Sequence, residues 1–376
     1  MTRATEVERR RLNDTFAELC RIASPSGGER ACAERVAQEL RSLGLEVEED
    51  GAAAETGAEC GNLLARIAGP GERSVMLCAH VDTVVPQAPI EPEVVEGGWV
   101  NAHSGILGAD NKAAVAVILE LARRAAAGDS PVGLELLFTV SEEVALAGAK
   151  AFDVARLHSP FGYVFDHATP IGDVVLASPS YYRMDVEFHG AAAHSGIRPE
   201  DGRSAIAAAA QAVAAMRLGR LDEETTTNVG GIEGGTATTN VVPERCRLWG
   251  EARSLDDVRA EDAVAEMVDR VHDGANATEC DVDVVVGKLF ESYRTRPSTP
   301  AVVAAESALR ACGYEPRRIA TGGGSDANAF EAAGFSCVNL ANGTERNHEP
   351  GERVAVAALE GMLDVGVALL DAVAEC

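Results

Sequence analysis

The chain has 376 residues, and its 33 lysines and arginines against 59 acidic residues give a formal net charge of −26. This length allows two or three domains that each bury a core, and the 46 % apolar fraction is typical of a globular protein. The negative balance argues against nucleic-acid binding, which requires clustered basic residues. The apolar runs are shorter than the about 20 residues of a membrane span, and residues 1–20 lack the apolar stretch of a signal peptide. We therefore expect a soluble, cytoplasmic protein with neither a nucleic-acid nor a membrane partner.

The first 170 residues alternate between helical and strand patterns. A helical pattern over Glu6–Leu43 is interrupted by the turn-forming cluster Ser24–Gly28. Further along, helix formers fill 110–127, and short apolar runs of strand length lie at 62–67, 74–78, 134–140 and 163–165. Strands separated by helices predict an α/β fold in which helices cover both faces of a sheet.

The pattern changes after residue 178. Apolar residues alternate with charged ones over 182–188, which is the period of a half-exposed strand. Helical patterns at 203–217 and 256–272 and strand patterns at 225–232, 245–253 and 280–286 complete the order β-α-β-β-α-β. That order predicts a ferredoxin-like domain at 179–294, inserted into an α/β domain made of 1–178 and 295–376.

A histidine and an aspartate follow the apolar run at 74–78. In extended chain, residues two apart point to the same side, so His80 and Asp82 would project together from a strand end. Open α/β sheets place their functional sites at such ends. The alternative is a surface histidine beside a turn carboxylate.

Four further segments place acidic residues or histidine at comparable positions. Asp110 precedes a strong helix, where it could instead be an N-cap. Glu142 and Glu143 follow an apolar strand, and adjacent carboxylates repel each other unless a cation or a shared proton compensates. Asp166 ends another apolar strand, and His348 follows an apolar run and a polar turn.

A parallel sheet would bring these segment ends to one edge. Imidazole together with carboxylate suits Zn²⁺, whereas Mg²⁺ and Ca²⁺ prefer oxygen ligands alone. Two histidines with several carboxylates are enough for two metal ions that share one bridging carboxylate. The residues therefore predict a dinuclear metal site.

Six separated sequence motifs of the chain resemble those of a known protein family. They read LCAHVDTVVP, LGADNKAAVAV, FTVSEEVALAGA, VFDHA, GAAAHSG and NGTERNHEP. In order and spacing the chain resembles the dinuclear-zinc exopeptidase family, which includes peptidase T, aminoacylase, carboxypeptidase G and succinyl-diaminopimelate desuccinylase. The match extends over about residues 10 to 370. It implies a discontinuous α/β/α catalytic domain whose inserted domain acts as a lid and dimerisation domain, and hence a homodimer.

The resemblance also implies roles for individual residues. His80 and Asp166 would bind one zinc ion, Glu143 and His348 would bind the other, and Asp110 would bridge the two. Cobalt or manganese could substitute for zinc in such a site.

Two more residues of this region receive roles from the same resemblance. Asp82 would orient His80 through a hydrogen bond, and Glu142 would be the general base that takes a proton from the attacking water and passes it to the leaving amine.

Three residues of the inserted domain match family positions that contact substrate. His194 would stabilise the oxyanion, although an isolated histidine is more often structural. Asn240 and Arg253 would bind substrate, because a guanidinium can hold a peptide carboxylate through two hydrogen bonds. For Arg253 the alternative is a solvated charge at a strand end. The glycine-rich turn Thr321–Asp326 lacks the ending of a phosphate loop, and in the family it approaches bound substrate.

The ligand at position 166 indicates the branch of the family. Aminopeptidase and dipeptidase members generally carry aspartate there, whereas acylase and carboxypeptidase members generally carry glutamate. The chain therefore resembles the peptidase T-like branch, which implies a metallopeptidase that hydrolyses the N-terminal residue of short peptides such as tripeptides. The alternatives are an N-acyl-amino-acid amidohydrolase or carboxypeptidase with the same metals and, more remotely, a non-catalytic metal-binding relative.

Overall fold

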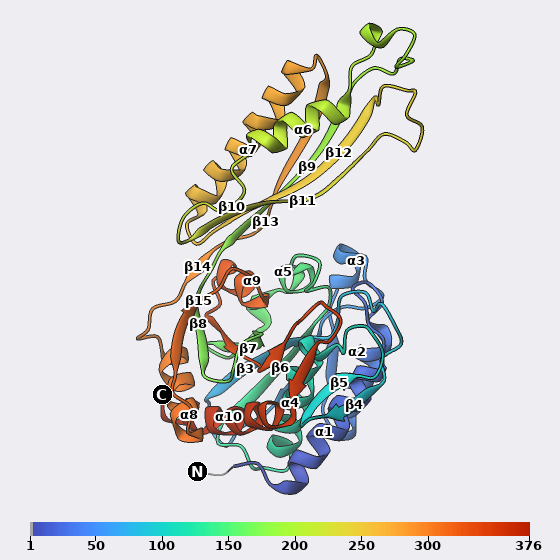
Figure 1. Cartoon of the computed structure of the whole chain (residues 1–376). Coiled ribbons are helices and arrows are strands. Elements are labelled where there is room, and N and C mark those ends of the chain that lie inside the picture. The colour runs from blue at the N-terminus through green and yellow to red at the C-terminus, as the bar shows by residue number, and fades with distance from the viewer. Residues whose placement is uncertain (1–2) are drawn as a thin grey trace. The chain divides into compact units, whose positions relative to one another are not determined.

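The computed structural model describes residues 3–376, which form two compact units. The larger unit comprises the residues up to Leu176 together with Arg294–Ala320 and Ser325–Cys376. The inserted unit comprises Ala177–Tyr293 and Thr321–Gly324. Figure 1 shows the ribbon of both units, coloured along the chain.

A mixed sheet lies at the centre of the larger unit. Its strands follow the order β1-β2-β6-β3-β7-β16-β8-β14, and β15 pairs with β8. They are β1 (Val47–Glu49), β2 (Leu63–Ile67), β3 (Ser74–His80), β6 (Gly133–Thr139), β7 (Gly162–His167), β8 (Asp173–Ser178), β14 (Tyr293–Arg294), β15 (Arg317–Ala320) and β16 (Cys337–Ala341). The central strands β6, β3, β7 and β16 run parallel to one another, so the segments that follow them emerge at the same edge.

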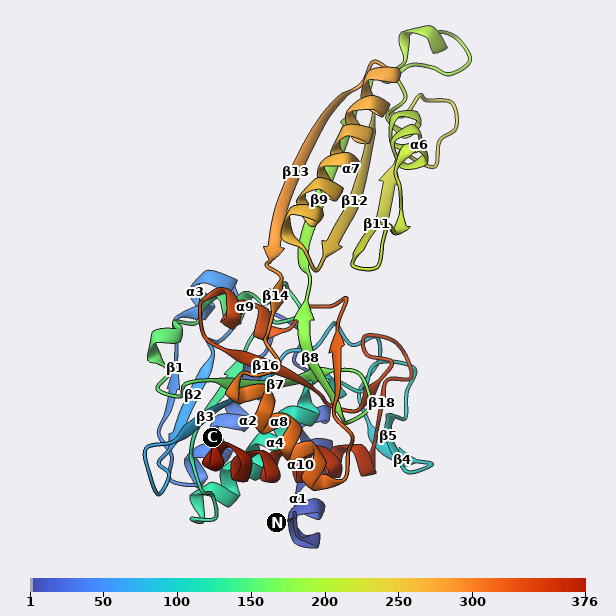
Figure 2. The same ribbon diagram turned by 90° about the vertical axis from the view of Figure 1, so that its left-hand side faces the viewer.

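Helices cover both faces of this sheet. Figures 1 and 2 place α1, α4, α8 and α10 on one face and α3 and α9 on the other. The helices of the unit are α1 (Glu6–Arg21), α2 (Arg30–Ser42), α3 (Ala52–Thr56), α4 (Ala109–Ala126), α5 (Ala147–Ala151), α8 (Pro300–Cys312), α9 (Asp326–Ala332) and α10 (Val356–Glu375). Helix α4 is almost completely buried, because its Ala, Val and Leu side chains pack between the sheet and α1 and α10. The predicted α/β/α layering is confirmed.

A second, small sheet was not predicted. Its order is β17-β18-β5-β4, built from β4 (Pro92–Val95), β5 (Gly98–Asn101), β17 (Thr344–Glu345) and β18 (Arg353–Ala355). These strands are only two to four residues long and few of their residues are buried, so they carry no strong apolar period that sequence patterns could reveal. The sheet fixes both ends of the loop that carries His348.

The inserted unit has the predicted β-α-β-β-α-β order with one short additional strand, β10, between α6 and β11. Its elements are β9 (Ser180–His189), α6 (Ala205–Ala215), β10 (Gly219–Arg220), β11 (Thr225–Gly234), β12 (Arg245–Ser254), α7 (Asp257–Ala277) and β13 (Asp281–Phe290). The sheet is antiparallel with the order β10-β11-β12-β9-β13, and α6 and α7 pack on one face, as Figure 2 shows. Buried residues alternate along β9, with Met184, Val186 and Phe188 facing the helices.

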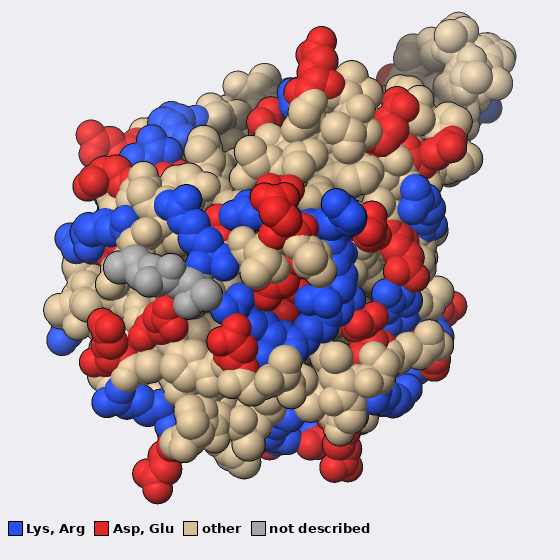
Figure 3. Space-filling model, turned by 90° about the horizontal axis from the view of Figure 1, so that it is seen from below, with Lys and Arg blue, Asp and Glu red and all other residues tan. Residues whose placement is uncertain are grey.

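Acidic and basic side chains are interspersed on one face of the larger unit. Figure 3 shows them interspersed on the face seen from below the view of Figure 1. Arg9 of α1, for example, pairs with Glu360 and Asp364 of α10. No helix within residues 3–376 combines the length and the hydropathy that a membrane crossing requires.

Candidate metal centre

The predicted ligand residues meet at the carboxyl edge of the parallel strands. His80 is the last residue of β3, Asp166 lies near the end of β7, and the loop after β6 carries Glu142 and Glu143. Asp110 stands at the start of α4, where the Asp110–Asn111 peptide bond is cis. His348 comes from the loop between β17 and β18. Segments spread over most of the chain thus contribute to one cluster.

Asp110 lies between the two histidines. Its Oδ1 is 3.3 Å from Nε2 of His80, and its Oδ2 is 3.3 Å from Nε2 of His348. Nε2 of His80 also lies 3.7 Å from Oδ1 of Asp166, and Nε2 of His348 lies 2.9 Å from Oε1 of Glu143. The two carboxylate oxygens of Asp110 therefore face two separate groups, each with one histidine and one further carboxylate.

Glu142 belongs to the same cluster. Possible ligand atoms of His80, Glu142 and Asp166 lie within 4.8 Å of one another, as do those of His80, Asp110 and Glu143. Glu142 is buried, and burial raises the pKa of its carboxyl well above the ordinary value, helped by the nearby charge of Asp166.

The other groups of the cluster are strongly shifted as well. Burial also raises the pKa of Asp166 and, less strongly, that of Glu143. The pKa of His348 is raised to about 10 by its hydrogen bonds to Asp110 and Glu143. Burial lowers the pKa of His80, but hydrogen bonds to Asp110 and to other carboxylates outweigh it and raise the pKa well above its usual range.

Asp82 fixes the orientation of His80. Nδ1 of His80 lies 3.0 Å from the backbone oxygen of Asp82 and 3.3 Å from its Oδ1, so Nδ1 is the donor nitrogen and Nε2 faces the cluster. The same carboxylate accepts the backbone N–H groups of Glu142 (3.0 Å) and Glu143 (3.2 Å). Asp82 therefore holds parts of two loops at once.

Glu352 is a residue of this region that sequence analysis missed. Its side chain is buried and accepts three backbone N–H groups, those of Leu107 and Gly108 at 2.8 Å and of Asp110 at 2.9 Å. It thereby joins the His348 loop to the segment that carries Asp110. No local pattern distinguishes Glu352 from the exposed glutamates 345 and 349 nearby, so the sequence offers no signal for its role.

This donor set fits a pair of divalent cations. Four carboxylates and two imidazoles converge, and every ion pair of these carboxylates within the described residues is made with His80 or His348 rather than with lysine or arginine. Two imidazoles are too few to balance four carboxylates, and uncompensated buried carboxylates are costly. Cations at this position would compensate them, and mixed nitrogen and oxygen donors suit zinc or a similar transition metal.

Comparison with known proteins matches both units. The family model for the M20 peptidase dimerisation domain matches residues 177–279, and that for peptidase family M28 matches residues 62–166. Aminopeptidase PepT from Bacillus cereus has a TM-score of 0.86 at 35 % identity, covering 97 % of this chain and 99 % of that one. A tripeptidase from Staphylococcus aureus has a TM-score of 0.91 at 32 % identity, covering 98 % and 99 %. The Bacillus subtilis protein YqjE is 33 % identical over 98 % of this chain and 100 % of its own.

The chain belongs to the M20 peptidase family. The predicted resemblance to the exopeptidase family that includes peptidase T, in its peptidase T-like branch, is confirmed. The protein is a metallopeptidase.

The inserted unit of this M20 peptidase carries the other three predicted residues. An antiparallel bridge between His194 and Val241 brings the His194 segment beside the Asn240 segment, and the N–H of Ser195 donates to the backbone oxygen of Asn240 at 3.0 Å. Both His194 and Asn240 are exposed. Arg253 stands apart from them, near the other end of β12.

Arg253 is held on three sides within this unit. Its Nε and Nη2 donate to the two carboxylate oxygens of Glu251 at 3.2 and 3.3 Å, and Nη1 donates to the backbone oxygen of Gly322 at 3.3 Å. The guanidinium also lies over the ring of Tyr181, 4.1 Å from its centroid. Arg253 is therefore not a solvated strand-end charge.

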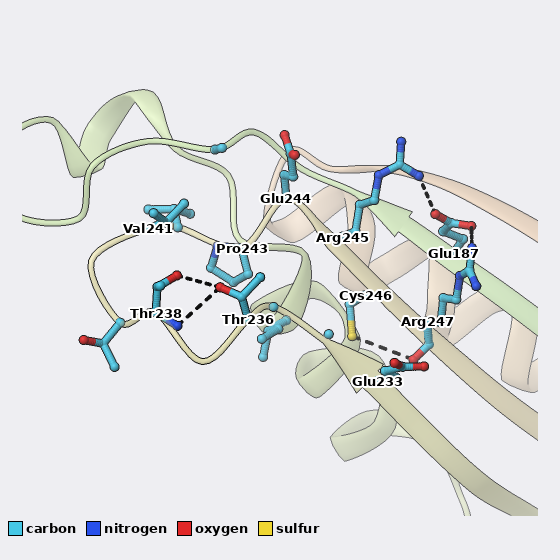
Figure 4. A pocket seen from close by; sticks show the side chains of 16 residues that line it. Glu187, Glu233, Thr236, Thr238, Val241, Pro243, Glu244, Arg245, Cys246 and Arg247 are labelled. Carbon is cyan, nitrogen blue, oxygen red and sulfur yellow. Dashed lines mark hydrogen bonds and ion pairs between the residues drawn. The ribbon is translucent and has the colours of Figure 1, made fainter.

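A cavity of about 670 Å³ also lies in the inserted unit. Figure 4 shows it between the loop at 234–243 and strands β9 and β12, with Thr236 bonded to Thr238 on one side and Glu187 between Arg245 and Arg247 on the other. The cavity contains none of the cluster residues described above. It lies next to Asn240, since Thr239 and Val241 line it.

Proposed function

We propose that this M20 peptidase is a zinc-dependent aminopeptidase that removes the N-terminal residue of short peptides, with tripeptides as its preferred substrates. The observation that carries the proposal is the position of Asp110, whose two oxygens each face one histidine and one further carboxylate group. The similarity to an aminopeptidase from Bacillus cereus and a tripeptidase from Staphylococcus aureus supports the substrate class.

This arrangement supports an assignment of ligands to two metal sites. His80 and Asp166 would hold one ion, Glu143 and His348 would hold the other, and the carboxylate of Asp110 would be shared by both. When bound, the ions polarise the scissile carbonyl and lower the pKa of the attacking water. Zinc suits the mixed imidazole and carboxylate donors best, and cobalt or manganese can replace it.

Glu142 is the general base in this mechanism. Its carboxylate takes a proton from the attacking water and later delivers that proton to the nitrogen of the leaving amine. The burial that raises its pKa favours a group able to hold the proton between the two steps. Asp82 keeps the base in place because it accepts the backbone N–H of Glu142.

Three residues of the inserted unit act on the substrate. His194 donates a hydrogen bond to the oxygen on which negative charge develops. Arg253 binds the carboxylate of the peptide. Glu251 and the backbone oxygen of Gly322 take three of the five guanidinium N–H groups, which leaves one N–H of Nη1 and one of Nη2 for a carboxylate. Asn240 contributes a further substrate contact.

We also infer that the protein is a cytoplasmic homodimer joined through the inserted unit. The match of residues 177–279 to a peptidase dimerisation domain supports the assembly.

Product analysis by mass spectrometry tests the proposal. Zinc-loaded protein is incubated with Leu-Gly-Gly, with its N-acetylated copy and with N-acetyl-methionine. The aminopeptidase releases leucine only from the peptide with a free amine, and Glu142→Ala abolishes the release. A matched control is Glu135→Ala, which removes another buried glutamate, away from the cluster.

Other products would contradict the proposal. Cleavage of the acetylated substrates instead would assign the protein to the acylase or carboxypeptidase branch. No turnover of any substrate with two zinc ions bound per chain would exclude this aminopeptidase activity and favour a binding role.

A further inference from the structure

The turn cluster Ser24–Gly28 has no part in the mechanism above, yet it contacts the catalytic loops. We call residues 24–29 the strap. Oγ of Ser24 donates to the backbone oxygen of Val81 at 2.8 Å, and its carbonyl accepts the N–H of Thr83 at 2.9 Å. Oγ of Ser26 donates to Oδ2 of Asp82 at 2.7 Å. The first half of the strap is therefore hydrogen-bonded to the loop that follows His80.

The last residue of the strap, Glu29, bonds to a different loop. Its side chain is 0 % exposed. Its Oε1 accepts the N–H of Gly27 at 2.8 Å, the N–H of Ser141 at 3.1 Å and the hydroxyl of Ser141 at 3.0 Å. Glu29 is the N-cap residue of α2, but its side chain makes no capping bond to that helix. The buried carboxylate of Glu29 therefore accepts hydrogen bonds from the loop after β6 rather than from its own helix.

Ser141 is a residue whose backbone needs such support. Its φ of 52° lies in the left-handed region, which is strained for a residue other than glycine. The two hydrogen bonds from Ser141 to Glu29 hold this conformation. Glu142 follows directly, so the backbone angles of Ser141 determine where the carboxylate of Glu142 points.

We propose that Glu29 is a positioning residue for Glu142. It holds Ser141 on one side of the base while Asp82 holds the N–H of Glu142 itself. The inference rests on the proposed role of Glu142 as the general base. Without Glu29, Ser141 is free to relax to ordinary backbone angles, and Glu142 turns away from the position it needs.

Three variants of the zinc-loaded full chain test the proposal. Glu29→Ala lowers kcat about 100-fold, because a misplacement of about 1 Å has that effect, and it leaves KM within about threefold. Glu29→Gln keeps an oxygen that accepts the Ser141 bonds, so its kcat stays within about fivefold of the wild type. Glu135→Ala is the matched control, since Oε2 of Glu135 also accepts two backbone N–H groups in a buried site, those of His158 and Ser159.

Hydrogen exchange in the metal-free chain provides a readout that does not depend on activity. The Ser141 amide is protected in the wild type, in Glu29→Gln and in Glu135→Ala, and it loses protection in Glu29→Ala. All four proteins bind two zinc ions per chain when zinc is supplied.

Three results would overturn the proposal. They are a kcat of Glu29→Ala no lower than that of Glu135→Ala, a Glu29→Gln variant as inactive as Glu29→Ala, and loss of zinc from Glu29→Ala. The proposed function itself fails differently, through a wild type that cleaves no peptide or a Glu142→Ala variant that stays active.

Discussion

The backbone N–H of Gly196 donates a hydrogen bond to Nδ1 of His194 over 3.2 Å. Because Nδ1 accepts this bond, the neutral imidazole carries its proton on Nε2. His194 therefore presents an N–H donor, which is the form that can stabilise a developing oxyanion. The Gly196 amide selects this tautomer within the His194 loop itself.

Removing the imidazole N–H of His194 should lower the turnover number more than it weakens binding of the peptide substrate. We expect His194→Ala to lower kcat about 100- to 1,000-fold, and His194→Gln to retain part of the activity because its amide offers a donor. His189→Ala is the control, since His189 lies in the same unit and pairs with Asp283 at 2.9 Å. Steady-state kinetics on Leu-Gly-Gly measure the effect. Equal activity of His194→Ala and the wild type would remove His194 from the mechanism.

Replacing Glu352 should weaken both the fold and the metal centre. Glu352→Ala leaves three buried N–H groups without their acceptor, so we expect a loss of about 3 kcal/mol in the free energy of unfolding of the metal-free chain. We also expect zinc affinity to fall about 10- to 100-fold, because the segment of Asp110 loses its support. Urea unfolding in EDTA and zinc titration measure these effects. The exposed Glu345→Ala is the control, and unchanged zinc affinity in Glu352→Ala would contradict the expectation.

Arg253 should discriminate peptides by their carboxyl terminus. Arg253→Lys keeps the charge but loses the planar pair of donors, so we expect kcat/KM for Leu-Gly-Gly to fall about 10- to 100-fold, mainly through KM. The amide-terminated peptide should be cleaved equally by both proteins. Arg183→Lys, which alters a sheet arginine paired with Asp185, is the control. An equal loss on both peptides would argue against carboxylate binding.

The Asp173–Arg317 pair should make stability depend on pH. Two hydrogen bonds of 2.7 and 2.6 Å from Arg317 lower the pKa of the buried Asp173 carboxyl, and they outweigh the effect of its burial. Because the folded-state pKa lies below the unfolded value of about 3.9, the contribution is fully present above that value and is lost as pH falls through the folded pKa.

We therefore expect Asp173→Asn to be less stable than the wild type at pH 7, with a difference that shrinks below about pH 4. Urea midpoints at pH 7, 5 and 3.5 measure it. Asp14→Asn, at an exposed position, serves as the control. A difference that is constant across this pH range would show that the charge of Asp173 is not responsible.

Local patterns predicted the parts of the fold that are long and buried. The helical pattern at 110–127 appears as α4 (Ala109–Ala126), and the alternation at 182–188 appears as β9 (Ser180–His189). The four strands of the small sheet were missed because they are short and bury few residues, so no burial pattern marks them.

Residue order alone identifies the residue types that could bind metal and the strand ends beside them. His80, Asp110, Glu143, Asp166 and His348 were all identified as candidates from one-dimensional pattern and family resemblance. A ligand here is a side chain with a donor atom that lies at the end of a strand or helix. The type of side chain and its position at such an end can both be read from residue order.

The buried carboxylates that support those residues become visible only in the folded chain. Glu352 reaches the N–H of Leu107, a residue 245 positions earlier, and Glu29 reaches Ser141, 112 positions later. The residues next to each of these glutamates in the sequence do not distinguish it from an exposed glutamate. The partner of a buried acceptor depends on which distant N–H groups the folded chain leaves unpaired, and that is a property of packing rather than of sequence pattern.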